Sequence, residues 1–233
     1  MAIFAISDLH LSFNADKPMD VFGDKWSNYT EKLKENWNKV VGNSDTVIIP
    51  GDTSWAMYID DALEDFKYIN SLNGRKIILK GNHDYWWTTL AKMNKFLSDN
   101  ELDTISFLQN GAENVENVAV CGTRGWTFPP FNSTGEDKKI FEREKQRLVL
   151  SLEAAVKLSN NGIIVAMHYP PMEKEKETSD FIDIMAEYKV KECVFGHLHG
   201  ASHLSAPSGE VKGIKLRFVS CDYTGFTPVL INR

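Results

Sequence analysis

The amino-acid sequence predicts an α/β fold with a largely parallel or mixed β-sheet at its core. The first observation is a series of short apolar runs, rich in β-branched residues and bounded by Gly, Asp or Pro, which is typical of buried strands. The second is that amphipathic stretches with a helical period lie between several of these runs. Strands that alternate with helices fold as a sheet covered by helices. A chain of 233 residues is long enough for one large core, and we expect a single domain over residues 1–233.

The apolar runs predict buried strands at residues 2–6, 46–49, 76–79, 118–121, 163–167, 192–195 and 216–220. Amphipathic periodicity predicts helices at residues 29–41, 59–72, 136–158 and 181–188. The first of these helices would place Leu33, Trp37 and Val40 on one face. The C-terminal part lacks such helices, so we expect successive antiparallel strands at residues 203–206, 214–220 and 228–231. Residues 172–179 are charged and lack apolar periodicity, which indicates an exposed loop.

Composition limits the classes of function. The net charge of −6 argues against non-specific nucleic-acid binding, which needs a basic face, although bound cations would still admit a nucleotide substrate. Cys121, Cys193 and Cys221 are odd in number and far apart, which predicts buried reduced thiols and argues against a disulfide framework or a Cys-based zinc site. Since neither a signal peptide nor an apolar stretch of membrane-spanning length is visible, we expect a cytoplasmic protein with no membrane partner.

Five short segments hold most of the candidate metal ligands, and each follows a predicted strand. They are Asp8-Leu9-His10, Gly51-Asp52, Gly81-Asn82-His83-Asp84, His168 and Gly196-His197-Leu198-His199. Of the six histidines, only His203 lies outside these segments. Because ligands bind at the carboxyl ends of strands in open α/β sheets, we expect the five loops to meet at one rim.

The spacing within the segments indicates how their side chains would reach a common ion. In extended backbone, residues i and i+2 point the same way, so Asp8 and His10 would share one ion while Leu9 turns into the core. The His-x-His pair of the last segment would do the same. Glycines precede the ligands where we expect tight turns with an unusual φ, at Gly51, Gly81 and Gly196.

Each segment alone has a simpler explanation, such as a turn, a capping residue or a pair of surface imidazoles. Together, their order, residue types and strand contexts agree on a metal site. Imidazole and carboxylate are ligands for borderline divalent metals such as Zn, Mn, Fe and Ni, and this set is large enough for two ions that share a carboxylate. Two such ions are a standard device for the attack of hydroxide on a phosphate ester.

The order Asp-x-His, Gly-Asp, Gly-Asn-His-Asp, His and Gly-His-x-His resembles that of the calcineurin-like metallophosphoesterases, and it spans residues 8–199. The resemblance implies a four-layer α/β/β/α sandwich with two mixed β-sheets and a dinuclear centre at one edge. It implies a first metal held by Asp8, His10 and His199, a second held by Asn82, His168 and His197, and a bridging carboxylate at Asp52. It also implies that His83 contacts the substrate phosphate and protonates the leaving oxygen, and that Asp84 orients His83.

One position departs from the family pattern. The second motif usually reads Gly-Asp-x-x-Asp or Gly-Asp-x-x-Glu, whereas here Trp55 stands at the position of the acid. Trp55 is therefore a candidate substrate contact. Together with Trp86, Trp87 and Trp126 it would form either an aromatic wall beside the site or a small satellite core under the loops.

Three further polar residues near the predicted strand ends have possible structural roles. Arg124 follows a predicted strand and would either clamp a substrate phosphate or form a structural ion pair, since arginine serves both roles. His203 falls outside the ligand pattern, and Asp222 follows the strand at residues 216–220 in a predicted turn. We expect structural roles for these last two.

The sequence therefore predicts a metal-dependent phosphoesterase in which hydroxide held by two divalent ions (Mn, Fe, Zn or Ni) attacks a small phosphoester substrate. The tryptophans near the motif loops favour a phosphodiester or nucleotide-like compound. The alternatives are a phosphomonoesterase or protein phosphatase-like activity, and a metal-bound scaffold of the same fold without turnover. A serine or thiol hydrolase is disfavoured because the sequence has neither a Gly-x-Ser-x-Gly elbow nor a Cys-His arrangement at a strand end.

Overall fold

The computed structural model describes residues 1–15, 17–130, 135–158 and 161–232. One sheet consists of β1 (Ile3–Ala5), β2 (Thr46–Ile49), β3 (Arg75–Ile78), β4 (Ile105–Phe107) and β11 (Val229–Asn232). The other consists of β5 (Ala112–Val115), β6 (Val118–Thr123), β7 (Ile163–Met167), β8 (Glu192–Phe195), β9 (Gly209–Val211) and β10 (Ile214–Phe218). The α-helices are α1 (Tyr29–Val40), α2 (Leu63–Ser71), α3 (Leu90–Asp99), α4 (Glu136–Leu158) and α5 (Asp180–Glu187). Short 3₁₀ helices are η1 (Met19–Phe22), η2 (Asp24–Trp26), η3 (Asp60–Ala62) and η4 (Gly200–Ser205).

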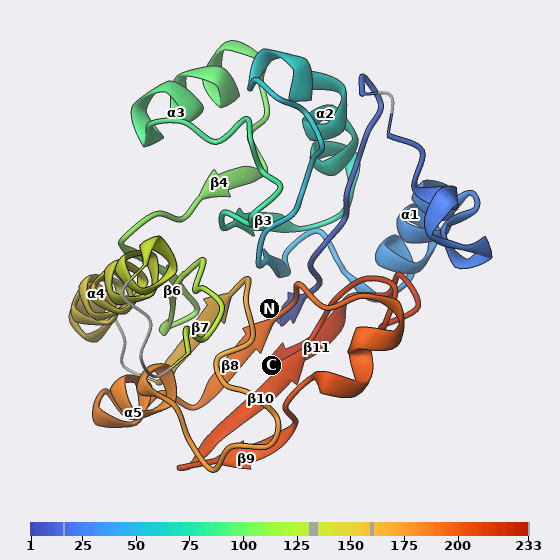
Figure 1. Cartoon of the computed structure of the whole chain (residues 1–233). Coiled ribbons are helices and arrows are strands. Elements are labelled where there is room, and N and C mark those ends of the chain that lie inside the picture. The colour runs from blue at the N-terminus through green and yellow to red at the C-terminus, as the bar shows by residue number, and fades with distance from the viewer. Residues whose placement is uncertain (16, 131–134, 159–160, 233) are drawn as a thin grey trace.

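The two sheets are mixed and lie face to face, with α1, α2 and α3 outside one and α4 and α5 outside the other (Figure 1). Their strand orders are β11-β1-β2-β3-β4 and β5-β6-β7-β8-β10-β9. This arrangement is the four-layer α/β/β/α sandwich, which confirms the predicted fold class.

Side-chain alternation along each strand builds the layers. In β1, Ile3 and Ala5 belong to the core between the sheets, whereas Phe4 packs into the core under α1, α2 and α3. In β8, Val194 faces the core between the sheets and its two neighbours pack against α4 and α5. Each central strand is therefore apolar on both faces, which is why the sequence shows continuous apolar runs at these positions.

Parallel pairing brings the carboxyl ends of the central strands to one edge of the sandwich. β1, β2 and β3 are parallel neighbours in one sheet, and β6, β7, β8 and β10 are parallel neighbours in the other. At this edge the sheets are joined by a parallel bridge between Ser7 and Ser220, with hydrogen bonds from Ser7 N to Val219 O (2.9 Å) and from Cys221 N to Ser7 O (2.9 Å). Loops from both sheets therefore meet here.

Several predicted elements differ from the structure, and the C-terminal part differs most. Most of residues 203–206 lie in η4, and β9 follows in a segment for which no strand was predicted. β10 pairs in parallel with β8, and β11 crosses to the other sheet, where it pairs antiparallel with β1 beside the two chain ends (Figure 1). None of the predicted antiparallel pairings therefore forms, and the antiparallel pair that is present, β9 with β10, involves a strand that was not predicted. Helix α3 and strands β4 and β5 were also not predicted.

Within the described part of the chain, no helix is both long and apolar enough to cross a membrane. The three cysteines are buried and unpaired, as predicted.

Candidate metal centre

The five ligand segments meet at the shared edge of the two sheets. β1, β2 and β3 of one sheet lead into Asp8, Asp52 and Asn82, and β7 and β8 of the other lead into His168 and His197. The structure thus brings together side chains that lie up to 191 residues apart in sequence, from position 8 to position 199. All five predicted segments take part in the cluster.

Four of the ligand residues at this edge are not extended, contrary to the expectation for the Asp-x-His and His-x-His spacings, whereas His199 is extended. Asp8, His10 and Asp52 have φ of 61°, 46° and 51°, and His197 has φ of 73°. Left-handed backbone is uncommon for such residues and persists where surrounding contacts enforce it. Here the amides of Asp8 and His10 donate to the carbonyl oxygens of Gly51 and Asp52, each at 3.0 Å. Hydrogen bonds between the loops, and not the alternation of side chains along a strand, therefore set the directions of these ligand side chains.

The glycines before the ligands serve two different purposes. Gly51 has φ of 87°, as expected for a tight turn. A Cβ at Gly81 would overlap the backbone nitrogen and the side-chain oxygen of Asp52, and a Cβ at Gly196 would overlap the side chains of Ser7 and Asp8. Neither Gly81 nor Gly196 has a positive φ. These two positions need glycine for close packing behind the carboxylates.

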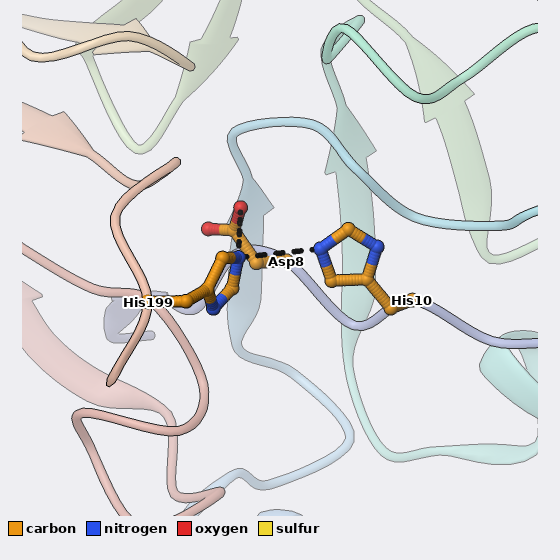
Figure 2. Close-up of side chains that lie close together, drawn as sticks. All are labelled: Asp8, His10 and His199. Carbon is orange, nitrogen blue, oxygen red and sulfur yellow. Dashed lines mark hydrogen bonds and ion pairs between the residues drawn. The ribbon is translucent and has the colours of Figure 1, made fainter. Parts of the chain in front are cut away.

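A first group of donor atoms is formed by Asp8, His10 and His199, whose ligand atoms lie within 4.8 Å of one another. His199 Nε2 lies 3.3 Å from Asp8 Oδ1 and 3.3 Å from His10 Nε2. Figure 2 shows the carboxylate and the two imidazole rings pointing toward a common centre. These are the three residues predicted for one metal.

A second group gathers around His168 and Asn82. His168 Nε2 lies 2.7 Å from Asn82 Oδ1 and 3.2 Å from His197 Nδ1, and His197 Nδ1 lies 3.0 Å from Asn82 Oδ1. His168 Nδ1 lies 3.0 Å from Pro50 O, and since a carbonyl oxygen only accepts, Nδ1 carries the proton. Nε2 therefore presents its lone pair to an amide oxygen at contact distance. A cation between these acceptors would resolve that conflict.

Asp52 lies between the two groups. Its Oδ2 is 3.8 Å from His10 Nε2 and 3.4 Å from His168 Nε2, while its Oδ1 accepts a hydrogen bond from the amide of His83 at 2.8 Å. Asp8 also belongs to a cluster with Asp52 and His168. However, Asp8 Oδ2 accepts hydrogen bonds from Ser7 Oγ, Ser220 Oγ and the amide of His197. Asp52 Oδ2 therefore accepts fewer hydrogen bonds than Asp8 Oδ2 does and is the more available oxygen between the two groups.

The electrostatics of this cluster suit cations. Burial lowers the pKa of His10 and of His168 to about 3, which keeps both rings in the neutral form that binds metals. Burial alone would raise the pKa of Asp8, but the hydrogen bond with His199 and the nearby His168 lower it, so this carboxylate stays ionised. Burial, followed by repulsion from Asp84 and Asp8, raises the pKa of Asp52. Buried carboxylates and neutral imidazoles together fit a pair of divalent ions.

His83 lies beside the first group and outside the donor clusters. Its ring centroid is 4.5 Å from that of Trp55 and 5.8 Å from that of His10. Its Nδ1 is buried without a hydrogen-bond partner. Burial lowers its pKa, so the ring is neutral near pH 7. His83 therefore borders the first donor group without belonging to it.

The expectation that Asp84 orients His83 is not met by the contacts. Asp84 Oδ2 accepts hydrogen bonds from the amides of Asp52 (2.9 Å) and Gly81 (2.7 Å), and Oδ1 accepts them from the amide of Thr53 (2.8 Å) and from the indole of Trp86 (3.0 Å). The buried carboxylate is saturated by these donors. Asp84 therefore links the β2 and β3 loops through these hydrogen bonds. Trp55, in contrast, packs against His83.

The remaining candidates separate into two sets. Arg124 lies 3.9 Å from the buried carboxylate of Glu144 and stacks on Trp126 at 4.5 Å, which matches the structural ion pair. Trp86 is buried in the core under α1, α2 and α3, and Trp87 packs against this core, so both rings are structural. Trp55 and Trp126 instead each line a cavity beside the donor groups.

Asp222 is a functional candidate to which the sequence analysis gave only a turn role. Its Oδ1 lies 3.0 Å from His199 Nδ1, and its Oδ2 accepts from the amide of Gly200 at 3.1 Å and lies 3.0 Å from His203 Nε2. Although burial alone would lower the pKa of His199, Asp222 and Asp8 raise it to about 10. The sequence feature that could have indicated this role is the position of Asp222 shortly after β10. The neighbouring strand β8 leads into His197 and His199.

Replacing Asp222 with Asn should weaken metal binding at the first group. A carboxylate behind a ligand histidine fixes the ring tautomer and raises its basicity, and losing it typically lowers metal affinity by about 10–100-fold. Competition with a chelator measures the affinity for Mn. Asp183→Asn, which removes an exposed carboxylate paired with Lys212, is the matched control. An unchanged Mn affinity in Asp222→Asn would mean that Asp222 only closes a turn.

Comparison with known proteins agrees with this geometry. The family model for calcineurin-like phosphoesterases matches residues 1–201. No curated protein sequence matches the chain. Among solved structures, a protein of unknown function, AQ665 from Aquifex aeolicus, is similar with a TM-score of 0.52 at 16% identity, and 98% of this chain and 95% of that chain are covered. Phosphopantetheinyl hydrolase (PptH) from Mycobacterium tuberculosis is similar with a TM-score of 0.57 at 11% identity, with 99% and 95% covered.

These structural likenesses concern the fold, whereas the family match covers most of the sequence and all five ligand segments. The match supports metal-dependent hydrolysis of a phosphoester as the general activity. Together with the two mixed sheets and the donor groups at their shared edge, it assigns the family. The chain belongs to the calcineurin-like phosphoesterases.

Proposed function

We propose that this chain hydrolyses a phosphodiester at a centre of two divalent cations. The observation that carries the proposal is the place of Asp52 Oδ2, 3.8 Å from His10 Nε2 and 3.4 Å from His168 Nε2, between two groups of donor atoms. Asp52 would be shared by both cations. One cation would be held by Asp8, His10 and His199, and the other by Asn82, His168 and His197.

The chain's own residues would divide the remaining work. Two cations bound there would supply a water nucleophile of lowered pKa and positive charge opposite the phosphate oxygens. His83 would contact the phosphate, whose negative charge would favour the protonated ring, and donate a proton to the leaving oxygen. Because its Nδ1 is buried, Nε2 is the nitrogen left for this role. Asp84 would hold the loops that carry Asp52 and His83 in register through its hydrogen bonds to backbone amides.

The diester preference is supported by the surroundings of His83. A cavity of about 560 Å³ borders His10, His83 and His199, and its wall includes Trp26 and Trp55. Trp55 stands where the related motif usually has an acid, so an aromatic face replaces a charge beside the reacting phosphate. An apolar or flat ester group fits such a wall better than a second charged group does.

A substrate panel tests this proposal. The metal-loaded protein is assayed with para-nitrophenyl phosphate, its bis ester and cyclic nucleotides, each with Mn, Fe, Zn, Ni, Co and Mg. We expect the highest kcat/KM for a diester with Mn or Fe, and poor activity with Mg because imidazole is a poor Mg ligand. A strong monoester preference would favour the phosphomonoesterase alternative. Full metal occupancy with no turnover on any ester would identify a scaffold.

Replacing His83 with Ala should lower kcat while the metal content stays at the wild-type value. Loss of a proton donor typically costs about 10²–10⁴-fold, and the loss should be larger for esters with poor leaving groups. Turnover of a series of aryl esters and elemental analysis of the same samples measure both effects. If His83→Ala loses a metal ion instead, His83 is a ligand and the assigned role is wrong.

A further inference from the structure

Two separate cavities border the donor groups. The first, which we name the Trp55 cavity, has a volume of about 560 Å³ and borders His10, His83 and His199. The second, which we name the Trp126 cavity, has a volume of about 520 Å³ and borders His197. Among the residues that the structure describes, the two cavities share no lining residue. The first cavity therefore borders the first donor group, and the second borders His197 of the second group.

The wall of the Trp55 cavity is a continuous set of rings that begins at the first donor group. Trp55 stacks on His10 with centroids 4.9 Å apart and planes 24° from parallel, and it lies 4.5 Å from His83. Trp26 lies 6.3 Å from His10 and 6.0 Å from His199. An organic group that enters this cavity from the phosphate would meet aromatic faces at once.

The wall of the Trp126 cavity begins in the same way at the second donor group. The ring of Tyr169 lies 4.0 Å from that of His197, and Trp126 lies 5.3 Å from Tyr169. Met172 and the exposed Leu204 extend the apolar lining. Aromatic rings thus lie beside both donor groups.

From these two walls we propose that the substrate is a phosphodiester with two organic arms, one seated in each cavity, and that the arm in the Trp55 cavity is released. This inference rests on the proposed function. A monoester would fill one cavity and leave the other open, whereas a diester has one substituent for each. His83 lines the Trp55 cavity and, in the described part of the chain, does not line the Trp126 cavity, so the leaving oxygen lies on the Trp55 side.

The reaction consumes one water and conserves all atoms. The water oxygen forms a bond to phosphorus, and the bond from phosphorus to the oxygen of the Trp55-side arm breaks, with its electron pair remaining on that oxygen. One proton of the water ends on this oxygen, so the arm leaves as an alcohol or phenol. The arm in the Trp126 cavity keeps the phosphate and leaves as a monoester.

The test compares two diesters with the same leaving group, para-nitrophenyl methyl phosphate and para-nitrophenyl phenyl phosphate. Because nitrophenolate leaves in both, only the retained arm changes. We expect the phenyl ester to have a kcat/KM about 10-fold higher in the wild type, since a stacked aromatic group gains affinity of that order. In Trp126→Ala this ratio should fall toward one, whereas in Trp55→Ala it should persist.

Two further variants guard against misfolding as an explanation. Leu204→Ala removes an exposed side chain from the Trp126 cavity and should lower the same ratio to a smaller extent. Tyr58→Ala removes an exposed aromatic ring that lines neither cavity, and its ratio should equal that of the wild type. A readout independent of turnover is the Kd of diphenyl phosphate relative to methyl phenyl phosphate, measured by calorimetry, and Trp126→Ala should abolish the preference for the diphenyl compound.

The outcomes separate this inference from the proposed function. A ratio near one in the wild type overturns the two-arm substrate, and a ratio lost in Trp55→Ala but kept in Trp126→Ala overturns the assignment of the arms. Hydrolysis of the nitrophenyl monoester without hydrolysis of either diester overturns the inference while phosphoester hydrolysis stands. No turnover of any ester by protein with its full metal content overturns the proposed function itself.

Discussion

Replacing Asp52 with Asn should reduce turnover of a nitrophenyl ester by more than the about 10²–10⁴-fold expected for loss of a proton donor. Asp52 Oδ2 lies between His10 Nε2 and His168 Nε2, so one carboxylate would neutralise charge on both cations. Converting it to an amide weakens two coordination shells at once. Asp8→Asn should cost less, because Asp8 Oδ2 accepts hydrogen bonds from Ser7, Ser220 and the amide of His197. Oδ1, to which the same amide also donates at 3.1 Å, is left for one ion.

The comparison is made by measuring kcat and metal content for both variants at saturating Mn. Asp99→Asn, which removes an exposed carboxylate paired with Lys95, should leave both quantities unchanged and serves as the control. Equal losses in Asp52→Asn and Asp8→Asn would mean that Asp52 is an ordinary terminal ligand. A larger loss in Asp8→Asn would identify Asp8 as the shared carboxylate, since Asp8 also lies in a cluster with Asp52 and His168.

A single methyl group at Gly81 should be as damaging as loss of the ligand behind it. A Cβ there would overlap the backbone nitrogen of Asp52 as well as its side-chain oxygen, and backbone cannot yield as a flexible side chain can. Adding atoms to a packed region typically costs about 1–3 kcal/mol in the free energy of unfolding. Here the strain would displace the loop that positions Asp52 and His83, so we expect Gly81→Ala to lose both metal ions and all turnover.

Gly111→Ala is the matched control, because a Cβ there would have its nearest neighbour at an ordinary 3.8 Å. Urea unfolding gives the free energy of unfolding, and elemental analysis gives the metal content of the same preparations. Gly81→Ala with wild-type stability and two bound ions would show that the loop can shift without disturbing the donors. Loss of metal with only a small change in stability would place the damage at the site.

The parts of the fold with strong local patterns could be predicted from the sequence. Continuous apolar runs identified β2, β7 and β8 with their observed bounds, and amphipathic periodicity did the same for α4. Helix α3 was missed although Thr89 caps it and Met93 and Phe96 are buried on one face. The pairing of β11 with β1 could not be predicted, because it joins the two ends of the chain through contacts that no local pattern encodes.

The ligand segments could be predicted because each carries its chemistry in a short motif after a strand. The directions in which the ligand side chains point could not be predicted from the sequence. They depend on left-handed backbone at Asp8 and His10, which is held by hydrogen bonds to the neighbouring β2 loop. The hydrogen-bond partners of Asp84 and Asp222 could likewise not be predicted from the sequence. Asp84 binds backbone amides of a loop about thirty residues away, and Asp222 reaches His199 only because β10 lies beside β8. Such roles depend on tertiary contacts between distant segments.

The most direct test of the account is the number of divalent ions that each chain binds. Protein stripped with a chelator is reconstituted with Mn, freed of excess metal and measured by elemental analysis against protein concentration. Donor atoms on both sides of Asp52 predict two ions per chain, and a value clearly below two in Asp52→Asn because both coordination shells are weakened. A firm value of one ion per wild-type chain would contradict the dinuclear centre and every role assigned around it.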